Sequence, residues 1–344
     1  MSELILTVNG QNYGGWTSIS VNRSIESVAG TFDLIVTERW SEQPTIRPIR
    51  PGQTATVSID GQTVITGFID DVLPSLNGNE HQVKFTGRSR TADLVDCSAI
   101  HKTGQWKKKS LKTIAQDVCR PFGINVVVET NIGGPIESES ISNGESVMEL
   151  LERVARQRGV MLTSNAASDL VITRAGKKRM ATAIVEGENM LGAAGKFSHR
   201  DRHSIYIGKG EQPDTGFIDP VDAAEPSAEV SDSDIRYRPL VLLAEDNATP
   251  ETMKKRVTWE RNVRYGRSTR VTLTVQGWKA DGVIWQPNSL VKTKSPSIGV
   301  DTELLIVGVN YILDSEGERT QMVLTGAGAF DVLELPPADD SFIL

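Results

Sequence analysis

Alternating apolar and polar positions dominate the first 95 residues and predict β-strands there. In residues 54–70, TATVSIDGQTVITGFID, two alternating runs flank the pair Asp60-Gly61. An Asp-Gly pair supplies the positive φ angles of a tight turn, so this stretch predicts a β-hairpin. Residues 81–89 predict another strand, because Val83 and Phe85 alternate with polar positions.

The pattern changes to a helical period after residue 97. Two helices are predicted, over 110–123 and 144–159, with Ser110 as the first N-cap and Gly159 closing the second. Their apolar stripes at i, i+3, i+4 and i+7 consist of Leu111, Ile114, Ala115 and Val118 in the first helix and Val147, Leu150, Leu151 and Val154 in the second. On the second helix we expect i, i+4 ion pairs, which are Glu149–Arg153 and Glu152–Arg156.

From about residue 196 the pattern again predicts strands. A long acidic loop is expected over 211–234, followed by a helix that Thr249 caps and Pro250 opens. This helix is basic, with the side chains of Lys254, Lys255, Arg256, Arg261 and Arg264. Its charges are interpreted as pairing with an acidic surface, such as the 211–234 loop of the same or a neighbouring chain.

Two distant stretches share an order of strands and turns. Residues 51–87 and 287–326 each open with Pro and a turn residue, pass through an Ile-x-Gly strand, and end in Thr-Gly. Any two β-meanders look alike to some degree, but the shared spacing favours an internal repeat. A closed three-fold ring of such chains would present six similar units, which suits contacts with six-fold and three-fold partners.

The predicted fold is therefore α+β and mainly β, with two similar β-barrel domains and a small α+β domain inserted between them. The expected domains are a first, tube-like barrel over 1–96, the α+β domain over 97–195, and a second barrel over 196–330. That second barrel carries a helical insertion around 249–265, and a C-terminal tail covers 331–344.

The segment RSIESVAG, residues 23–30, places charged residues between apolar strand positions. It either holds a catalytic carboxylate or forms a bend in a strand that faces a partner.

Composition and charge narrow the functional classes. The 344 residues are 38% hydrophobic and 24% charged, which is typical of a folded soluble protein, and the net charge of −7 argues against a dedicated nucleic-acid binder. The N-terminus lacks the pattern of a secretory signal, and no stretch approaches the roughly 18 apolar residues of a membrane span. The two cysteines, Cys97 and Cys119, are expected to be free thiols.

Catalytic and metal-binding motifs are missing from the sequence. There is no GxSxG, HExxH or P-loop, and GAAGK at 192–196 has the wrong spacing for phosphate binding and is expected to connect two strands. His199, Asp201 and His203 could bind a metal on a helix, but their context predicts a strand entry, where i and i+4 lie too far apart. We therefore expect no catalytic residue, cofactor or metal.

Four long stretches carry a resemblance to a known family. They are GGWTSISVNRSIESVAGTFDL (14–34), GRSRTADLVDCSAIHKTGQWKKKSLKTIAQDVCRPFG (87–123), RGVMLTSNAASDLVITRA (158–175) and SDIRYRPLVLLAEDNAT (233–249). Together they closely resemble the baseplate hub protein of Mu-like contractile-tailed bacteriophages, from about residue 5 to 330. The resemblance leads us to expect a shorter tail after residue 330 than in that family.

The resemblance implies a structural role and no enzymatic activity. It implies a homotrimer whose barrels form a pseudo-six-fold ring between the six-fold tail tube and the three-fold central spike, beside other baseplate proteins. DNA would pass through the bore without specific binding, and the chain would not insert into a membrane. The implied location is the virion tail baseplate, and the host bacterial cytoplasm during assembly.

On this interpretation RSIESVAG interrupts a barrel strand, and its charges face a subunit or tube neighbour. The candidate interface residues are Arg23, Glu26, Arg88, Arg90, Lys254, Arg256, Arg261 and Arg264. Two alternatives of other classes are a tail-associated cell-wall hydrolase, since tail tips often carry one, and a carbohydrate-binding module.

Overall fold

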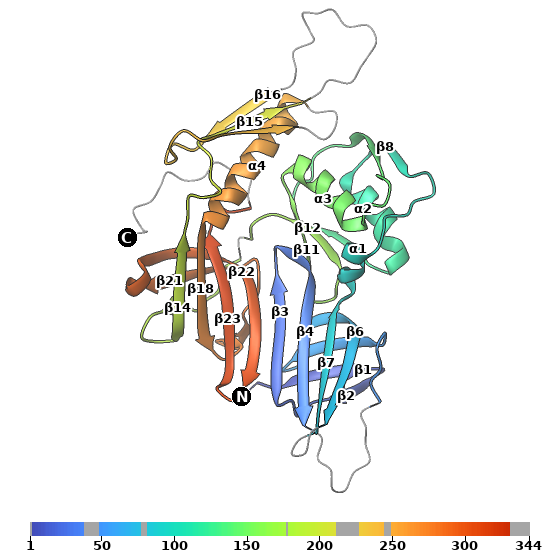
Figure 1. Cartoon of the computed structure of the whole chain (residues 1–344), viewed down its shortest axis with the longest axis vertical. Coiled ribbons are helices and arrows are strands. Elements are labelled where there is room, and N and C mark those ends of the chain that lie inside the picture. The colour runs from blue at the N-terminus through green and yellow to red at the C-terminus, as the bar shows by residue number, and fades with distance from the viewer. Residues whose placement is uncertain are drawn as a thin grey trace, which may run out of the picture.

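The computed structural model describes residues 2–37, 48–76, 81–176, 178–210, 227–243 and 249–330. Strands dominate the described residues, so the mainly β character is confirmed (Figure 1). The expected tail over 331–344 and residues 211–226 of the expected acidic loop lie outside the described residues.

Seven strands form the first β region, which we define as residues 2–89. They are β1 (Leu4–Val8), β2 (Gln11–Tyr13), β3 (Ser18–Ser24), β4 (Ser27–Thr37), β5 (Thr54–Ile59), β6 (Gln62–Leu76) and β7 (His81–Ser89). The predicted hairpin is β5–β6, and Asp60 and Gly61 at its turn have φ of 46° and 77°. A two-residue turn with two positive φ angles matches the twist of the two strands, and Asp-Gly is one of the pairs that adopt it most readily.

The second β region comprises residues 178–197 and 269–330. Its strands are β13 (Ile184–Val185), β14 (Met190–Phe197), β18 (Thr269–Gln276), β21 (Leu290–Ser295), β22 (Val300–Asp314) and β23 (Gly317–Gly326), with a small hairpin of β19 (Lys279–Ala280) and β20 (Val283–Ile284) and the short helix η3 (Pro296–Ile298). The expected domain boundary at residue 195 falls inside β14, so that boundary does not coincide with the end of an element. Residues 192–196 are part of this strand, and the expectation of a connector there is wrong.

The two β regions share one strand order. In the first region the order across the sheet is β5-β6-β7-β4-β3, and in the second it is β21-β22-β23-β18-β14. If the five strands of each series are counted along the chain, the order across the sheet is third, fourth, fifth, second, first in both regions. All the pairs are antiparallel. β6 and β22 are both 15 residues long, and both carry a bulge near their middle. The repeat expected between residues 51–87 and 287–326 therefore corresponds to equivalent strands.

The two regions join edge to edge through β3 and β22. Residues 308–313 of β22 pair antiparallel with residues 19–24 of β3, and this pairing makes one 13-stranded sheet (Figure 1). Apolar side chains from both regions also form one hydrophobic cluster. The expectation of two separate barrels is therefore not met, because the described strands form one continuous ladder and no closed barrel.

Between the β regions the chain forms the middle region, residues 90–174. Its elements are η1 (Arg90–Ala92), α1 (Asp93–Asp96), β8 (Gln105–Lys109), α2 (Leu111–Cys119), η2 (Arg120–Phe122), β9 (Val126–Val128), β10 (Ile136–Ser140), α3 (Val147–Arg158), β11 (Met161–Ser164) and β12 (Leu170–Thr173). Ser110 caps α2 and Gly159 closes α3 in a left-handed conformation, as predicted. Both predicted stripes are buried in a cluster that is distinct from the core of the large sheet.

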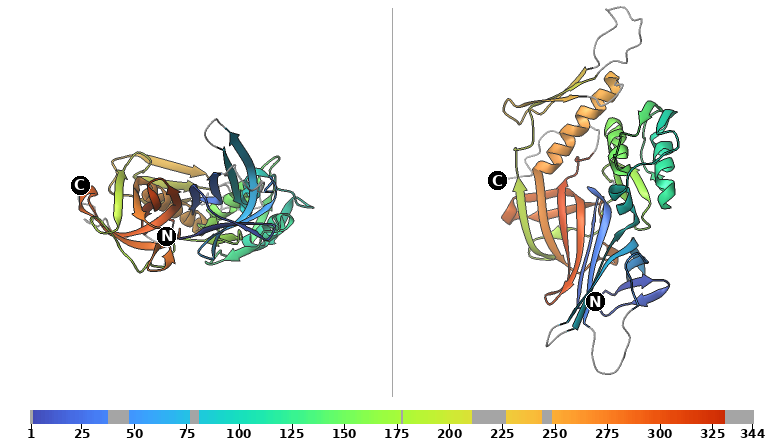
Figure 2. Two further views of the ribbon diagram at one scale, coloured as in Figure 1. Left: turned by 90° about the horizontal axis from the view of Figure 1, so that it is seen from below. Right: turned by 45° about the vertical axis from the view of Figure 1, so that its right-hand side comes forward.

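A long helix and a small sheet extend from the second β region. The helix α4 (Pro250–Ser268) begins at the Thr249 cap as predicted, and it packs on β15 (Ile205–Lys209) and β16 (Ser227–Ser231) of a small sheet that β17 (Pro239–Leu243) completes. β16 lies within the expected acidic loop, so residues 227–231 form a strand instead. Figure 2 shows α4 standing above the large sheet, beside the middle region, and α3 contacts α4. Within the described residues no helix is long and apolar enough to cross a membrane.

Candidate functional site: the junction of the three regions

The RSIESVAG segment forms the end of a β-hairpin, not an interruption within one strand. β3 ends at Ser24 and β4 begins at Ser27, so Ile25 and Glu26 form the turn. Ile25 is buried, and its amide donates a hydrogen bond to the carbonyl of Val307 at 2.8 Å. The turn therefore lies where the first β region, the second β region and the middle region meet.

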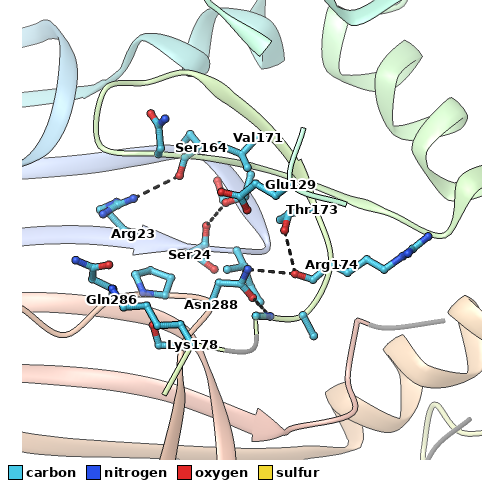
Figure 3. A pocket seen from close by; sticks show the side chains of 18 of the residues that line it. Arg23, Ser24, Glu129, Ser164, Val171, Thr173, Arg174, Lys178, Gln286 and Asn288 are labelled. Carbon is cyan, nitrogen blue, oxygen red and sulfur yellow. Dashed lines mark hydrogen bonds between the residues drawn. The ribbon is translucent and has the colours of Figure 1, made fainter. Parts of the chain in front are cut away.

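Arg23 reaches from β3 into the middle region. Its Nη2 donates to the carbonyl of Ser164, at the end of β11, at 3.3 Å (Figure 3). Burial lowers the pKa of the Arg23 guanidinium, although the nearby Tyr311 opposes this effect. Arginine still remains charged at any physiological pH, so the side chain carries a cation into the junction.

Glu26 links the turn to α4 and to the second β region. Its carboxylate accepts hydrogen bonds from Arg267 Nε, at 3.1 Å, and from Arg270 Nη2. The side chains of Glu26 and Arg270 are only 21% and 23% exposed, whereas Arg267 is 57% exposed. Arg23 and Glu26 thus both contact other parts of their own chain, and their expected contact with a neighbouring subunit stays a prediction.

A cavity of about 690 Å³ opens beside the turn. Its walls come from the β3–β4 turn, from β11 and β12, and from residues 174–176, 178 and 286–289 (Figure 3). The side chains of Arg23, Arg174, Lys178 and Glu129 line it, so its walls carry charged groups beside apolar surface. The cavity is a space between regions, and among the described residues that line it Glu129 is the one acid.

Asn288 ties the two chain segments at the bottom of this cavity together. Its Oδ1 accepts from the Gly176 amide at 2.6 Å, and its Nδ2 donates to the Arg174 carbonyl at 3.1 Å. A Cβ atom on Gly176 would lie 1.8 Å from the carbonyl oxygen of Asn288. Only glycine permits so close an approach of two backbones.

The candidates Arg88 and Arg90 also make contacts within the chain. Arg88 forms ion pairs with Asp70 at 2.7 Å and Asp96 at 2.8 Å, and these hydrogen bonds raise the pKa of its guanidinium. Arg90 Nη1 donates to the carbonyl of Gly123 at 3.0 Å. Arg88 therefore connects the first β region to α1, whereas Arg90, in η1, contacts the residue that follows η2 within the middle region.

The basic side chains of α4 are mostly neutralised locally. Arg256 and Arg264 both pair with Glu260 at 2.7 Å, one turn away on the same helix. Arg261 donates to Asn262 and to the carbonyl of Ser231, which belongs to the segment where we expected an acidic loop. Lys254 is exposed. Burial opposes the ionisation of Glu260, but its two arginine partners lower its pKa overall.

Two buried ionic clusters were missed from the sequence. Arg153 does not pair with Glu149, which completes the α3 capping box instead; it binds Glu139 at 2.7 Å and Glu145 at 2.8 Å. The predicted Glu152–Arg156 contact is present, at 3.9 Å.

The second cluster centres on Arg202, which is 6% exposed. It binds Asp232 at 2.8 Å and Asp234 at 3.1 Å, and its guanidinium lies 4.9 Å from the ring centre of Tyr265. It fixes the β15–β16 sheet to α4. No local spacing rule finds either cluster, because the acids lie 8 to 32 residues away in the chain.

The described residues contain neither a candidate metal site nor a disulfide. No group of three or more His, Cys, Asp or Glu side chains there could hold a metal ion, and His199, Asp201 and His203 lie in the turn between β14 and β15. Both cysteines are free; Cys97 is exposed, whereas Cys119 is buried, and burial raises the pKa of the Cys119 thiol to about 12.

Comparison with known proteins decides what this three-region arrangement is. The baseplate hub protein gp44 of Escherichia phage Mu is 35% identical over 336 residues, which cover 94% of this chain and 88% of that protein. The chain belongs to the Mu baseplate hub family. Residues 91–174 match the second domain of gp44-like baseplate hub proteins, and residues 3–89 and 249–333 match the N-terminal and fourth domains of GpP-type Mu phage baseplate assembly proteins.

Solved structures agree with the hub family. The crystal structure of the 43 kDa tail protein of prophage MuSo2 from Shewanella oneidensis has a TM-score of 0.85 and 38% identity, and the match covers 95% of this chain and 99% of that one. A tail protein from Neisseria meningitidis MC58 shares the fold, with a TM-score of 0.82, 22% identity, and 96% and 98% of the two chains covered. Like its relatives, this hub protein is a structural component of a phage tail baseplate.

Proposed function

We propose that three copies of this hub protein form a ring that adapts the six-fold tail tube to the three-fold central spike. The observation that carries this proposal is the strand order that both β regions share. It is β5-β6-β7-β4-β3 in the first region and β21-β22-β23-β18-β14 in the second. Because β22 and β3 join the two regions edge to edge, one chain presents two similar units side by side in one sheet. Three chains would therefore present six similar units.

The same ring would form part of the passage for DNA. Phosphate contacts from lysine and arginine dominate affinity for DNA, so a passage must avoid a strongly basic wall if DNA is to move through it. The net charge of −7, and the local pairing of the α4 arginines with Glu260, favour a protein that does not retain DNA. The proposed partners are the tail tube protein, the spike protein and other baseplate components.

We also propose that the chain is divided into the domains expected from the sequence, and that the eight candidate interface residues contribute to the ring. Seven of the eight side chains make hydrogen bonds or ion pairs within the chain, and the exposed Lys254 is the eighth. Three of these side chains, Arg23, Glu26 and Arg88, contact a different region of the chain, and the contacts of the other four lie within one region. We propose that they support the ring by fixing the shape of each subunit.

The mass of the purified chain in solution tests the ring. Sedimentation equilibrium should give three times the 37.5 kDa of one chain, and end-on electron-microscopy views should show six lobes around a hole. A monomer at micromolar concentration would refute the proposal. A trimer with three lobes would refute the equivalence of the two β regions.

A further inference from the structure

Two edges of the large sheet carry no strand among the described residues. Residues 193–196 of β14 pair on one side only, with β18. Residues 71–76 of β6 likewise pair only with β7, because β5 ends its pairing at Phe68. The strand order puts these two edges on opposite sides of the β22–β3 junction (Figure 1).

In the second β region the edge equivalent to that of β6 is occupied. The correspondence is close at the bulge: the Gly52 amide donates to Ile69 O and the Asn288 amide to Ile306 O, both at 2.8 Å. Beyond the bulge, residues 71–76 of β6 therefore correspond to residues 308–313 of β22, which pair with β3.

The partner strand has an equivalent as well. Val21 of β3 lies opposite Phe32 of β4, and Gly195 of β14 lies opposite Val271 of β18. Phe32 and Val271 in turn face Gly87 and Leu324 at matching positions of β7 and β23. Residues 193–196 of β14 therefore correspond to residues 19–22 of β3.

We propose that β14 of one copy of this chain pairs antiparallel with the outer edge of β6 of the next copy. This inference rests on the proposed ring and specifies its contact between subunits. We assume that β6 and β14 pair in the same register as their equivalents β22 and β3. Lys196 then lies opposite Leu73 of the neighbour, and Gly195 lies opposite Pro74. It likewise places Ala194 opposite Ser75 and Ala193 opposite Leu76.

The two edges suit each other in chemistry. Leu73 and Leu76 on β6 are 49% and 65% exposed, and Leu191 on β14 is 60% exposed, which is costly for unpaired edges and favourable once they are covered. The small residues at 192–195 allow another strand to approach. Pro74 lacks an N–H group, so the Pro74–Gly195 pair would have one hydrogen bond where Tyr311–Val21 has room for two.

The contact is head to tail, because two different edges meet. Such a contact closes into a ring when its rotation closes, and otherwise continues as a filament. Since it repeats the geometry of the junction inside the chain, three copies would have six similar junctions around the ring. Closure then needs no strand geometry that a single chain does not already contain.

A designed disulfide tests the register. Leu73→Cys and Lys196→Cys, introduced with Cys97→Ser, place two thiols in a non-hydrogen-bonded pair with Cα atoms about 4.5 Å apart, within the range of a disulfide. We expect mild oxidation to yield covalent dimers and trimers on non-reducing gels. The matched control pairs Pro74→Cys with Lys196→Cys, which places the thiols on opposite faces of the sheet, and it should remain uncrosslinked.

The outcomes separate this inference from the ring itself. A trimeric mass with no cross-link at Leu73/Lys196, or with equal cross-linking in the control, would overturn the pairing and leave the ring standing. A monomeric mass would overturn both.

A charge-swap series gives an independent readout. Leu73→Lys would face Lys196, so association should weaken by up to about fivefold at each contact, and adding Lys196→Glu should restore it. Both positions are exposed, so circular dichroism should show an unchanged fold. Association unaffected by Leu73→Lys would contradict the register.

Discussion

The cluster around Arg153 allows a quantitative test of what stabilises the middle region. The side chains of Glu139 and Glu145 are only 1% and 8% exposed, and both bind Arg153, which is 17% exposed. Replacing Arg153 with Met keeps most of its apolar length but leaves two carboxylates in a poorly solvated site. Removing one partner of a buried ion pair costs about 3–5 kcal/mol.

Hydrogen exchange of the α3 amides measures this loss. If α3 exchanges when the middle region opens, a loss of 3–5 kcal/mol lowers protection by roughly two to three and a half orders of magnitude. Glu152→Gln is the matched control on the same helix. It breaks the surface contact with Arg156, in which the Glu152 side chain is 52% exposed. An exposed pair contributes up to about 1 kcal/mol, so its effect should stay below tenfold.

A third variant shows whether Arg153→Met destabilises the protein by leaving buried charges unpaired or by changing the packing. Adding Glu139→Gln and Glu145→Gln to Arg153→Met removes the buried charges, and it should recover much of the protection. If Arg153→Met lowers protection no more than Glu152→Gln does, the cluster is not a buried ionic contact and the reasoning fails.

Three further outcomes are expected. The double variant Arg23→Met/Glu26→Gln should keep its secondary structure but sediment partly as monomer, because both side chains fix the angle between regions; an unchanged trimer would contradict this role. Gly176→Ala should unfold at a clearly lower temperature than wild type, since its Cβ would meet the Asn288 carbonyl, whereas Gly134→Ala, which has open space around it, should melt unchanged. Equal melting of the two variants would show that the backbones can move apart. A disulfide reagent at pH 8 should label the exposed Cys97, while Cys119, buried and with its pKa raised to about 12, should react only after unfolding; labelling of both thiols in the native protein would contradict the burial.

Local signals in the sequence were sufficient to predict the long helices and several of the strands. Ser110, Gly159 and Thr249 each mark an end that the structure confirms, because capping depends on a few adjacent residues. The strand at 81–89 was predicted with its correct limits. β14 was missed because its small residues lack the alternating pattern, and its pairing with β18 decides its conformation.

Contacts between distant parts of the chain explain the other errors. The turn at Ile25–Glu26 carries no Asn-Gly or Asp-Gly signal, so its strands were interpreted as one interrupted strand. The partners of Arg153 and Arg202 come from other elements, and composition does not specify which acids they bind. The β22–β3 pairing is decisive for the shape of the chain, yet it joins residues about 290 positions apart.

The shared ladder between β3 and β22 also limits how this protein can be dissected. A fragment cut after residue 96 would leave the backbone groups of β3 bare where β22 now lies, and the complementary fragment would expose the same length of β22. Bare, partly apolar strand borders recruit further copies and precipitate. Fusions and truncations intended for biophysical work should therefore retain both halves and place any tag away from that seam.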